Sequence, residues 1–133
     1  PGLVGLPEWF WVPRGRWHPV SVTVTAGQVQ ATATATPLRL TFSPGAGLAG
    51  QTCAGPATAF RPPAGDQQPS CAYSYLQSSA LQPHRAYQAA VIVGWRVTWS
   101  GSGGAGGVLN PDLQVAEAIQ LRVAEGQALV TSR

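Results

Sequence analysis

Charged residues are scarce in this chain of 133 residues: only 10% are Asp, Glu, Lys or Arg, and there is no lysine. The formal net charge is +3, but the basic residues are dispersed, except that Arg14 and Arg16 lie close to His18. Proteins that bind nucleic acid usually concentrate positive charge on one face or in one groove. The dispersion indicates scattered, solvated charges, and we expect no nucleic-acid partner.

Long apolar runs are also absent. No stretch of about 18 apolar residues occurs, so this sequence predicts no membrane-spanning helix. The first residues lack the charged and apolar regions of a secretory signal. The chain starts at Pro1 with GLVGLPEWFWV, and we interpret it as a mature or trimmed fragment of an exported protein.

Catalytic and metal-binding patterns are missing as well. The acids are widely spaced, and the two histidines, His18 and His84, sit beside prolines or in loops. Neither the G-x-S-x-G elbow nor the H-E-x-x-H helix motif occurs. Two cysteines with two distant histidines do not form a zinc ligand set. We therefore predict that the chain is not an enzyme and binds no metal. The acids are Glu8, Asp66, Asp112, Glu117 and Glu125.

Two glycine-rich stretches, GAGLAG from Gly45 and GSGGAG from Gly101, fit the pattern G-x-G-x-x-G. A dinucleotide site also requires a helix after the glycines, whose N-terminus faces the pyrophosphate. The residues that follow, QTCAGP and GVLNPD, do not start helices. We predict turns at both places and no cofactor.

Only two cysteines occur, Cys53 and Cys71, and they enclose the turn-rich segment AGPATAFRPPAGDQQPS. This segment has few side chains that could anchor it by packing. A disulfide here would stabilise the fold by about 3 kcal/mol. The alternative is two free buried thiols. The disulfide implies an oxidising compartment, so we expect an extracellular or cell-envelope location.

Alternating apolar and polar residues predict strands throughout. Val29, Ala31, Ala33 and Ala35 share one strand face, and threonines occupy the other. Tyr87, Ala89, Val91, Val93, Trp95, Val97 and Trp99 share one side of a long strand. Leu113, Val115, Ile119, Leu121 and Val123 should point inward, with Glu117 among them. The strands are expected at residues 20–25, 28–36, 38–42, 51–54, 72–76, 86–99 and 113–123. We predict an all-β antiparallel sandwich whose last two strands form an extended C-terminal β-hairpin.

The stretches ATPLRLTFSPGAG, SCAYSYLQSS and RAYQAAVIV resemble the PKD domain, an immunoglobulin-like β-sandwich, over roughly residues 28–123. Phe42 falls at the family's tryptophan, Gly45 and Gly47 at its two glycines, and Tyr75 at its tyrosine, while Tyr73 replaces a histidine. With VAEGQAL near its end, the chain is similar to a group of exported bacterial proteins with a PKD-like core. The resemblance implies a non-catalytic extracellular module. Ser43 and Ala46 replace both aspartates of the family's turn, so we expect this turn to hold no divalent cation.

The five tryptophans fall into two groups: Trp9, Trp11 and Trp17 near the start, and Trp95 and Trp99 on the long strand. Strands usually run about 5 to 6 residues, so residues 95–99 should project from the core or bend at Gly94. We expect residues 1–19 to form an N-terminal aromatic arm that packs on the domain of residues 20–133 and covers these tryptophans. The alternative is an exposed aromatic surface.

Two functions fit these observations. The first is a cell-surface module for protein interaction or structural spacing, whose partner is another protein or a second copy of itself. Its candidate partner-binding residues are Arg14, Arg16, Trp17 and Trp99. The alternative is a carbohydrate-binding module that stacks polysaccharide rings on exposed tryptophans, which requires at least two coplanar exposed indoles.

Overall fold

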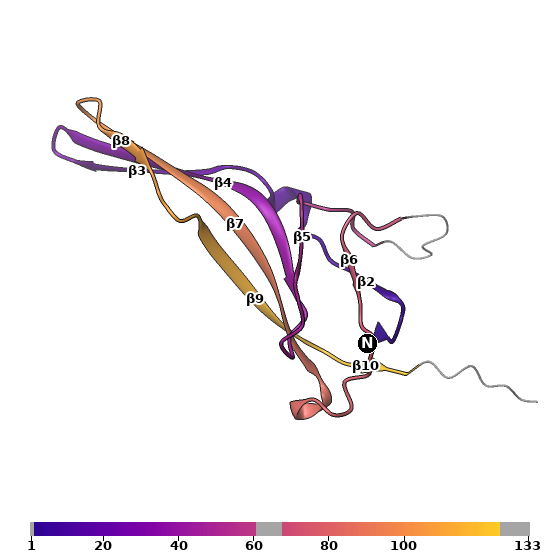
Figure 1. Ribbon diagram of the computed structural model, residues 1–133. Helices are drawn as coiled ribbons and strands as arrows, with labels where there is room; N and C mark the ends of the chain where they lie inside the picture. Colours follow the sequence, from indigo (N-terminus) through magenta and orange to yellow (C-terminus); the bar gives the residue numbers. More distant parts are fainter. Residues whose placement is uncertain (1, 61–67, 126–133) are drawn as a thin grey trace, which may run out of the picture.

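The computed structural model describes residues 2–60 and 68–125, and the predicted all-β fold is confirmed (Figure 1). One large antiparallel sheet dominates, and two short strand pairs lie beside it. Two short 3-10 helices, η1 (Arg14–Arg16) and η2 (Pro83–Arg85), interrupt the connections. Asp66 and the last four residues of VAEGQAL lie outside the described residues.

The large sheet has six strands. At one end the order is β3-β4-β7-β8, and towards the other end β5 pairs with β4 and β9 pairs with β7. The predicted antiparallel pairing of the two strands is confirmed, because β7 and β9 pair from Tyr87 with Leu121 to Trp95 with Leu113. They do not form a simple hairpin, however, since β8 lies between them in the chain and pairs with the outer end of β7. The strands are β3 (Val20–Ala26), β4 (Val29–Ser43), β5 (Gln51–Cys53), β7 (Tyr87–Gly101), β8 (Gly106–Val108) and β9 (Leu113–Leu121).

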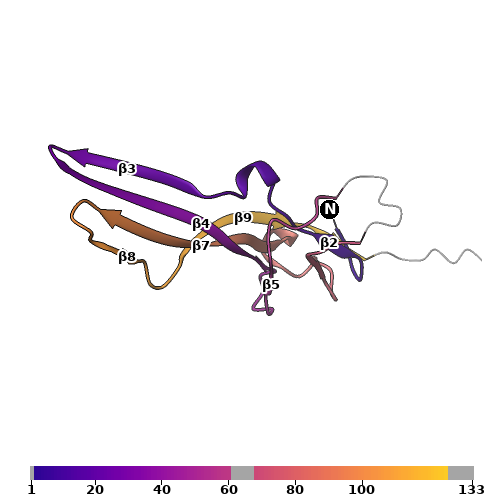
Figure 2. The same ribbon diagram turned by 90° about the horizontal axis from the view of Figure 1, so that it is seen from above.

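The second layer is much smaller. β2 (Pro7–Trp9) pairs antiparallel with β6 (Ala72–Ser74), while β1 (Gly2–Leu3) pairs with β10 (Val123–Ala124) in parallel. These short strands face only one half of the large sheet, which we call the base. The other half, residues 20–36 and 95–108, projects beyond them in both views, and we call it the blade (Figures 1 and 2).

β4 is one continuous strand of 15 residues, so the prediction of two strands, at residues 28–36 and 38–42, is wrong. Pro37 has no backbone N–H, but it lies where the register with β7 shifts between Pro37 and Arg39, a position at which a strand tolerates proline. The sequence predicted a bend or bulge at Gly94 of β7. The bulge lies in β4 instead, because Gly94 itself pairs regularly with Arg39.

The core lies in the base and is rich in aromatic rings. Phe10 from the N-terminal arm stacks on Phe42 of β4, with ring centroids 4.8 Å apart. Tyr75 stacks on Tyr87 at 4.2 Å and is fully buried. Leu40 completes the centre of this cluster at 0% exposure. Because large aromatic side chains bury the most apolar area per residue, this small group can hold the two layers together.

Two buried tyrosines also fix the loops around the core. The Tyr75 hydroxyl donates a hydrogen bond to the Pro44 carbonyl (2.9 Å), and the Tyr87 hydroxyl donates one to the Gln77 carbonyl (2.8 Å). Burial raises the pKa of both phenols above the usual range, so both stay protonated donors at neutral pH. Tyr75 thereby holds the turn that begins at Pro44.

The predicted disulfide is confirmed. Cys53 at the end of β5 is bonded to Cys71, just before β6, with their Cα atoms 6.0 Å apart. The bond joins an edge of the large sheet to the second layer. It also closes the loop for which the sequence indicates few packing residues.

Both glycine-rich stretches form turns, as predicted. Gly45 has a φ of +86°, and a Cβ at this position would approach the Gln88 backbone oxygen to 2.6 Å. Only glycine can adopt this positive φ without strain and also leave room for the Gln88 oxygen. Gly45 therefore serves the close approach of the turn to β7.

Candidate interaction surface

The blade carries one apolar face. Its members are Val20, Val22, Val24, Val29, Ala31, Ala33, Ala35, Trp95, Val97 and Trp99, which the strand register places on one side of the sheet. We call this set the apolar face. Val22, Val24 and Val29 are 59%, 65% and 66% exposed, and Trp99 is 46% exposed. Ala35, Trp95 and Val97 are half-buried, whereas the other members remain largely uncovered in the described part of the chain.

The register shift decides where this face points. Beyond it, Leu40 pairs with Val93, whereas before it Ala35 pairs with Val97. Odd-numbered residues of the outer half of β4 therefore share a side with even-numbered residues of its inner half. As a result, the apolar face continues the same side of the sheet that forms the buried core in the base.

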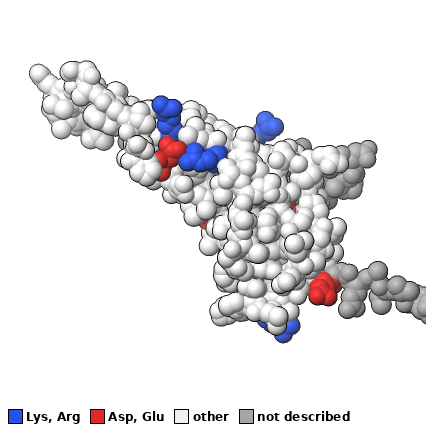
Figure 3. All heavy atoms as spheres, in the orientation of Figure 1, with Lys and Arg blue, Asp and Glu red and all other residues white. Residues whose placement is uncertain are grey.

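The opposite face of the blade is polar and carries two hydroxyl pairs. Hydroxyl pairs cross from β3 to β4, with Ser21 and Thr34 at 2.9 Å and Thr23 and Thr32 at 2.8 Å. Such cross-strand pairs stabilise a sheet face that remains in water. Residues 20–36 and 97–111 contain no charged residue, and the end of the blade is free of charge in Figure 3.

A groove of about 280 Å³ lies where the blade meets the base, between the N-terminal arm and the sheet. Its two charged lining residues are Arg16 and Glu117, of opposite sign. The Trp17 ring closes one end by lying against the backbone of Gly55, where no Cβ would fit. The lining residues are Trp11, Val12, Pro13, Arg16, Trp17, Val91, Val93, Trp95, Val115, Glu117 and Ile119.

β9 extends the apolar surface along the base. Leu113, Val115 and Ile119, which we call the β9 row, share the side of the apolar face because they pair with Trp95, Val93 and Ala89. They are 44%, 53% and 37% exposed, so the prediction that they point into a core is wrong. The predicted side of the sheet is correct, but the second layer is too small to cover these three side chains. Val123, by contrast, is buried.

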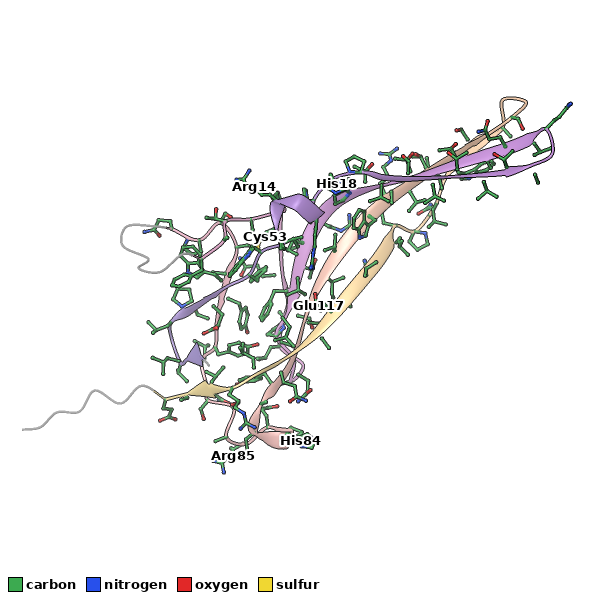
Figure 4. All side chains as sticks on the ribbon, turned by 180° about the vertical axis from the view of Figure 1, so that it is seen from behind. Arg14, His18, Cys53, His84, Arg85 and Glu117 are labelled. Atoms are coloured by element: carbon green, nitrogen blue, oxygen red, sulfur yellow. A yellow bond between two sulfur atoms is a disulfide. The ribbon has the colours of Figure 1, made fainter. Side chains whose placement is uncertain are left out.

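The structure separates the predicted partner-binding residues. Arg16 and Trp17 line the groove, whereas Arg14 lines a neighbouring hollow beside Ala57, and Trp99 lies on the blade. In Figure 4, Arg14 and His18 lie beside η1, where the blade meets the base, whereas His84 and Arg85 lie at the far end of the base. Glu117 lies between these two places on β9.

The N-terminal arm covers the core in a different way from the one expected. Phe10 enters the core, while Trp9 stays half-buried with its ring edge-on to Phe60 at 5.1 Å. Trp11 reaches the groove together with Trp95. The expectation that the arm also covers Trp99 is wrong, because Trp99 is 46% exposed. The other four tryptophans are half-buried.

One ion pair links β4 to the residues before β9. Arg39 donates to Asp112 at 3.0 Å across the backbone of Gly94, in a partly exposed ion pair. Burial raises the pKa of the Glu8 carboxyl. Residues 2–60 and 68–125 contain no cluster of three or more His, Cys, Asp or Glu side chains that could hold a metal ion. In the same ranges, no helix has the length and apolarity needed to cross a membrane.

The exposure of Val20, Val22, Val24 and Val29 was not predicted from the sequence. Alternation placed Val29 on one face with Ala31, Ala33 and Ala35, but it did not show that this face lacks a covering layer. The absence of charge from residues 20–36 favours a covered face, because exposed edge strands usually carry charges. No family model, curated protein or solved structure matches this chain.

Proposed function

We propose that this chain is a non-catalytic, PKD-like module of the cell exterior that binds a protein partner through its blade. One observation carries the proposal: the apolar face, which is continuous with the groove and the β9 row, is large, uncovered and free of charge. Contiguous apolar patches of several hundred Å² on soluble proteins usually mark interaction sites. The disulfide supports an extracellular or cell-envelope location.

The chemistry of the surface favours a protein over other partners. A nucleic acid requires a basic patch, and the blade has no charged residue between 20 and 36. Carbohydrate stacking requires two exposed coplanar indoles, but Trp99 alone of the five tryptophans is in the exposed class. Aliphatic side chains on a sheet fit against another sheet or an apolar protein surface. Arg16 and Trp17 would then contact the part of the partner that reaches the groove. Arg14, which lines the neighbouring hollow, would contact the partner at the edge of the interface.

Photo-crosslinking in the producing cell tests this function. A photoreactive amino acid is placed at Val24, on the apolar face, or at Thr25, the adjacent residue on the polar face. We expect protein adducts from position 24 and few from position 25, because only the first side chain would face the partner. Equal labelling from both positions, or no adduct from position 24, would contradict the proposal.

A further inference from the structure

The blade lacks the layer that would complete it as a sandwich. In the base, Phe10, Tyr73 and Tyr75 pack on Phe42 of the large sheet, and Phe42 and Leu40 are buried. Over the blade the same side of the same sheet stays exposed, with Val24 at 65%. A sheet with one apolar and one polar face is stable in water only when a second apolar surface covers the first. The missing component is therefore a facing layer of similar size.

A second copy of the chain can supply that layer. We propose that two chains pack blade against blade, apolar face to apolar face, as an isologous dimer in which each blade completes a sandwich with the other. This inference rests on the proposed function and identifies its partner. Two sheets of equal length and equal twist match when a twofold axis relates them, so one surface serves both sides.

The exposed area agrees with what a dimer requires. The large side chains of the apolar face expose roughly 500 Å² in one chain, and the adjoining β9 row brings the total to roughly 700 Å², near the ~800 Å² per partner of a stable protein interface. The total exceeds the ~300–600 Å² of the largest apolar patch on a typical monomer, so a dimer that covers the β9 row as well as the blade approaches the required area. The members are mainly valine and alanine, which interdigitate well between facing sheets.

The charges also permit self-association. Two copies of a surface with a net charge repel each other, but residues 20–36 and 97–111 carry none. At the end of this surface the groove contains one cation, Arg16, and one anion, Glu117. The two charges cancel, so the groove adds no net charge that would repel a second copy. Nothing in this distribution selects a strongly acidic or basic partner.

Face-to-face packing of two blades accounts for the exposed apolar face better than pairing of two sheet edges does. β3 is an end strand of the sheet and has no proline or charged residue, so its backbone could in principle pair with another β3. Antiparallel pairing of two β3 edges would leave Val22 and Val24 of both copies exposed, because the apolar faces would lie side by side. Face-to-face packing buries them.

Sedimentation velocity of the purified chain, from about 1 to 100 µM, tests the proposal over the range in which a weak dimer dissociates. We expect a monomer–dimer equilibrium. Val24→Glu should weaken the dimer at least about tenfold, because it buries a carboxylate in the interface. Thr25→Glu adds the same charge one residue away on the polar face and should leave the dimer intact. Both side chains are exposed in the monomer, and circular dichroism checks that both variants fold.

The quenching of Trp99 fluorescence gives a second measurement. The indole should become less accessible to acrylamide as the wild-type protein is concentrated, and Trp99→Phe should remove this change. Equal weakening by Val24→Glu and Thr25→Glu would overturn the proposal in favour of edge pairing. A wild-type chain that stays monomeric would overturn it too. If position 24 then crosslinks to a different protein in cells, the proposed function holds and only the identity of the partner is wrong.

Discussion

Replacing Phe10 by alanine tests whether the N-terminal arm is part of the fold. Phe10 is 5% exposed, and its ring stacks on Phe42 at an interplanar angle of 23°. Its backbone N–H also donates to the Cys71 carbonyl at 3.2 Å, which ties the arm to the disulfide. Truncating a buried phenylalanine removes its transfer free energy and leaves a cavity, so we expect a loss of about 3 to 5 kcal/mol.

Urea unfolding followed by circular dichroism measures this loss as a change in the free energy of unfolding. Leu6→Ala is the matched control, because Leu6 lies in the same arm but is 54% exposed, and its loss should stay below about 1 kcal/mol. Deleting residues 1–12 removes Phe10 together with β1 and β2 and should destabilise the domain at least as much. A Phe10→Ala variant within 1 kcal/mol of the wild type, comparable to Leu6→Ala, would show that the arm does not belong to the core.

Four further predictions follow from the base. Replacing Cys53 and Cys71 by serine should cost about 3 kcal/mol in chemical unfolding, and a loss well below this would show that the loop is anchored by other contacts. Tyr75→Phe leaves the buried Pro44 carbonyl without its donor and should cost about 1 to 3 kcal/mol, whereas unchanged stability would indicate that another donor replaces it. Burial raises the pKa of Glu8 above its ordinary 4.5, so the stability from its protonated form is complete below 4.5 and is lost as the pH rises through the folded-state value. Glu8→Gln should therefore raise the melting temperature at pH 7 but change it little at pH 3.5, and a pH-independent difference would contradict this cause. Calcium should leave the melting temperature unchanged, since Ser43 and Ala46 offer no carboxylate, and a clear increase would refute the expectation.

The alternation of apolar and polar residues predicted well which side of the sheet each residue occupies, because alternation is a local property of the chain. Trp95, Val97 and Trp99 share a side with Val91 and Val93, as alternation required. The disulfide was also predictable, because only two cysteines exist and the loop between them has few packing residues. Neither inference requires knowing how the distant parts of the chain pack: alternation is local, and two cysteines allow only one intramolecular pairing.

The burial of those sides was not predictable in the same way. Whether Leu113 or Val115 is covered depends on how large the second layer is, and that layer consists of strands of only three residues. Alternation in EWFWV gives Trp9 and Phe10 opposite sides, but it does not say which side faces the core. Phe10 enters because its ring fits against Phe42, a contact between residues far apart in the sequence. Tertiary packing thus decides both whether the β9 residues are covered and which aromatic ring of the arm enters the core.

The extra residue in β4 connects the fold to the proposed function. Leu38 stands unpaired at the register shift between Pro37 and Arg39 and is 42% exposed. Ala33 and Leu40 are seven residues apart, so regular pairing of β4 without a bulge would place them on opposite sides of the sheet. The blade residues of β3 and β4 would then lie on the far side from the groove and from Trp99, and no single partner could contact both. The bulge at Leu38 therefore makes the core side of the base and the exposed side of the blade a single continuous surface.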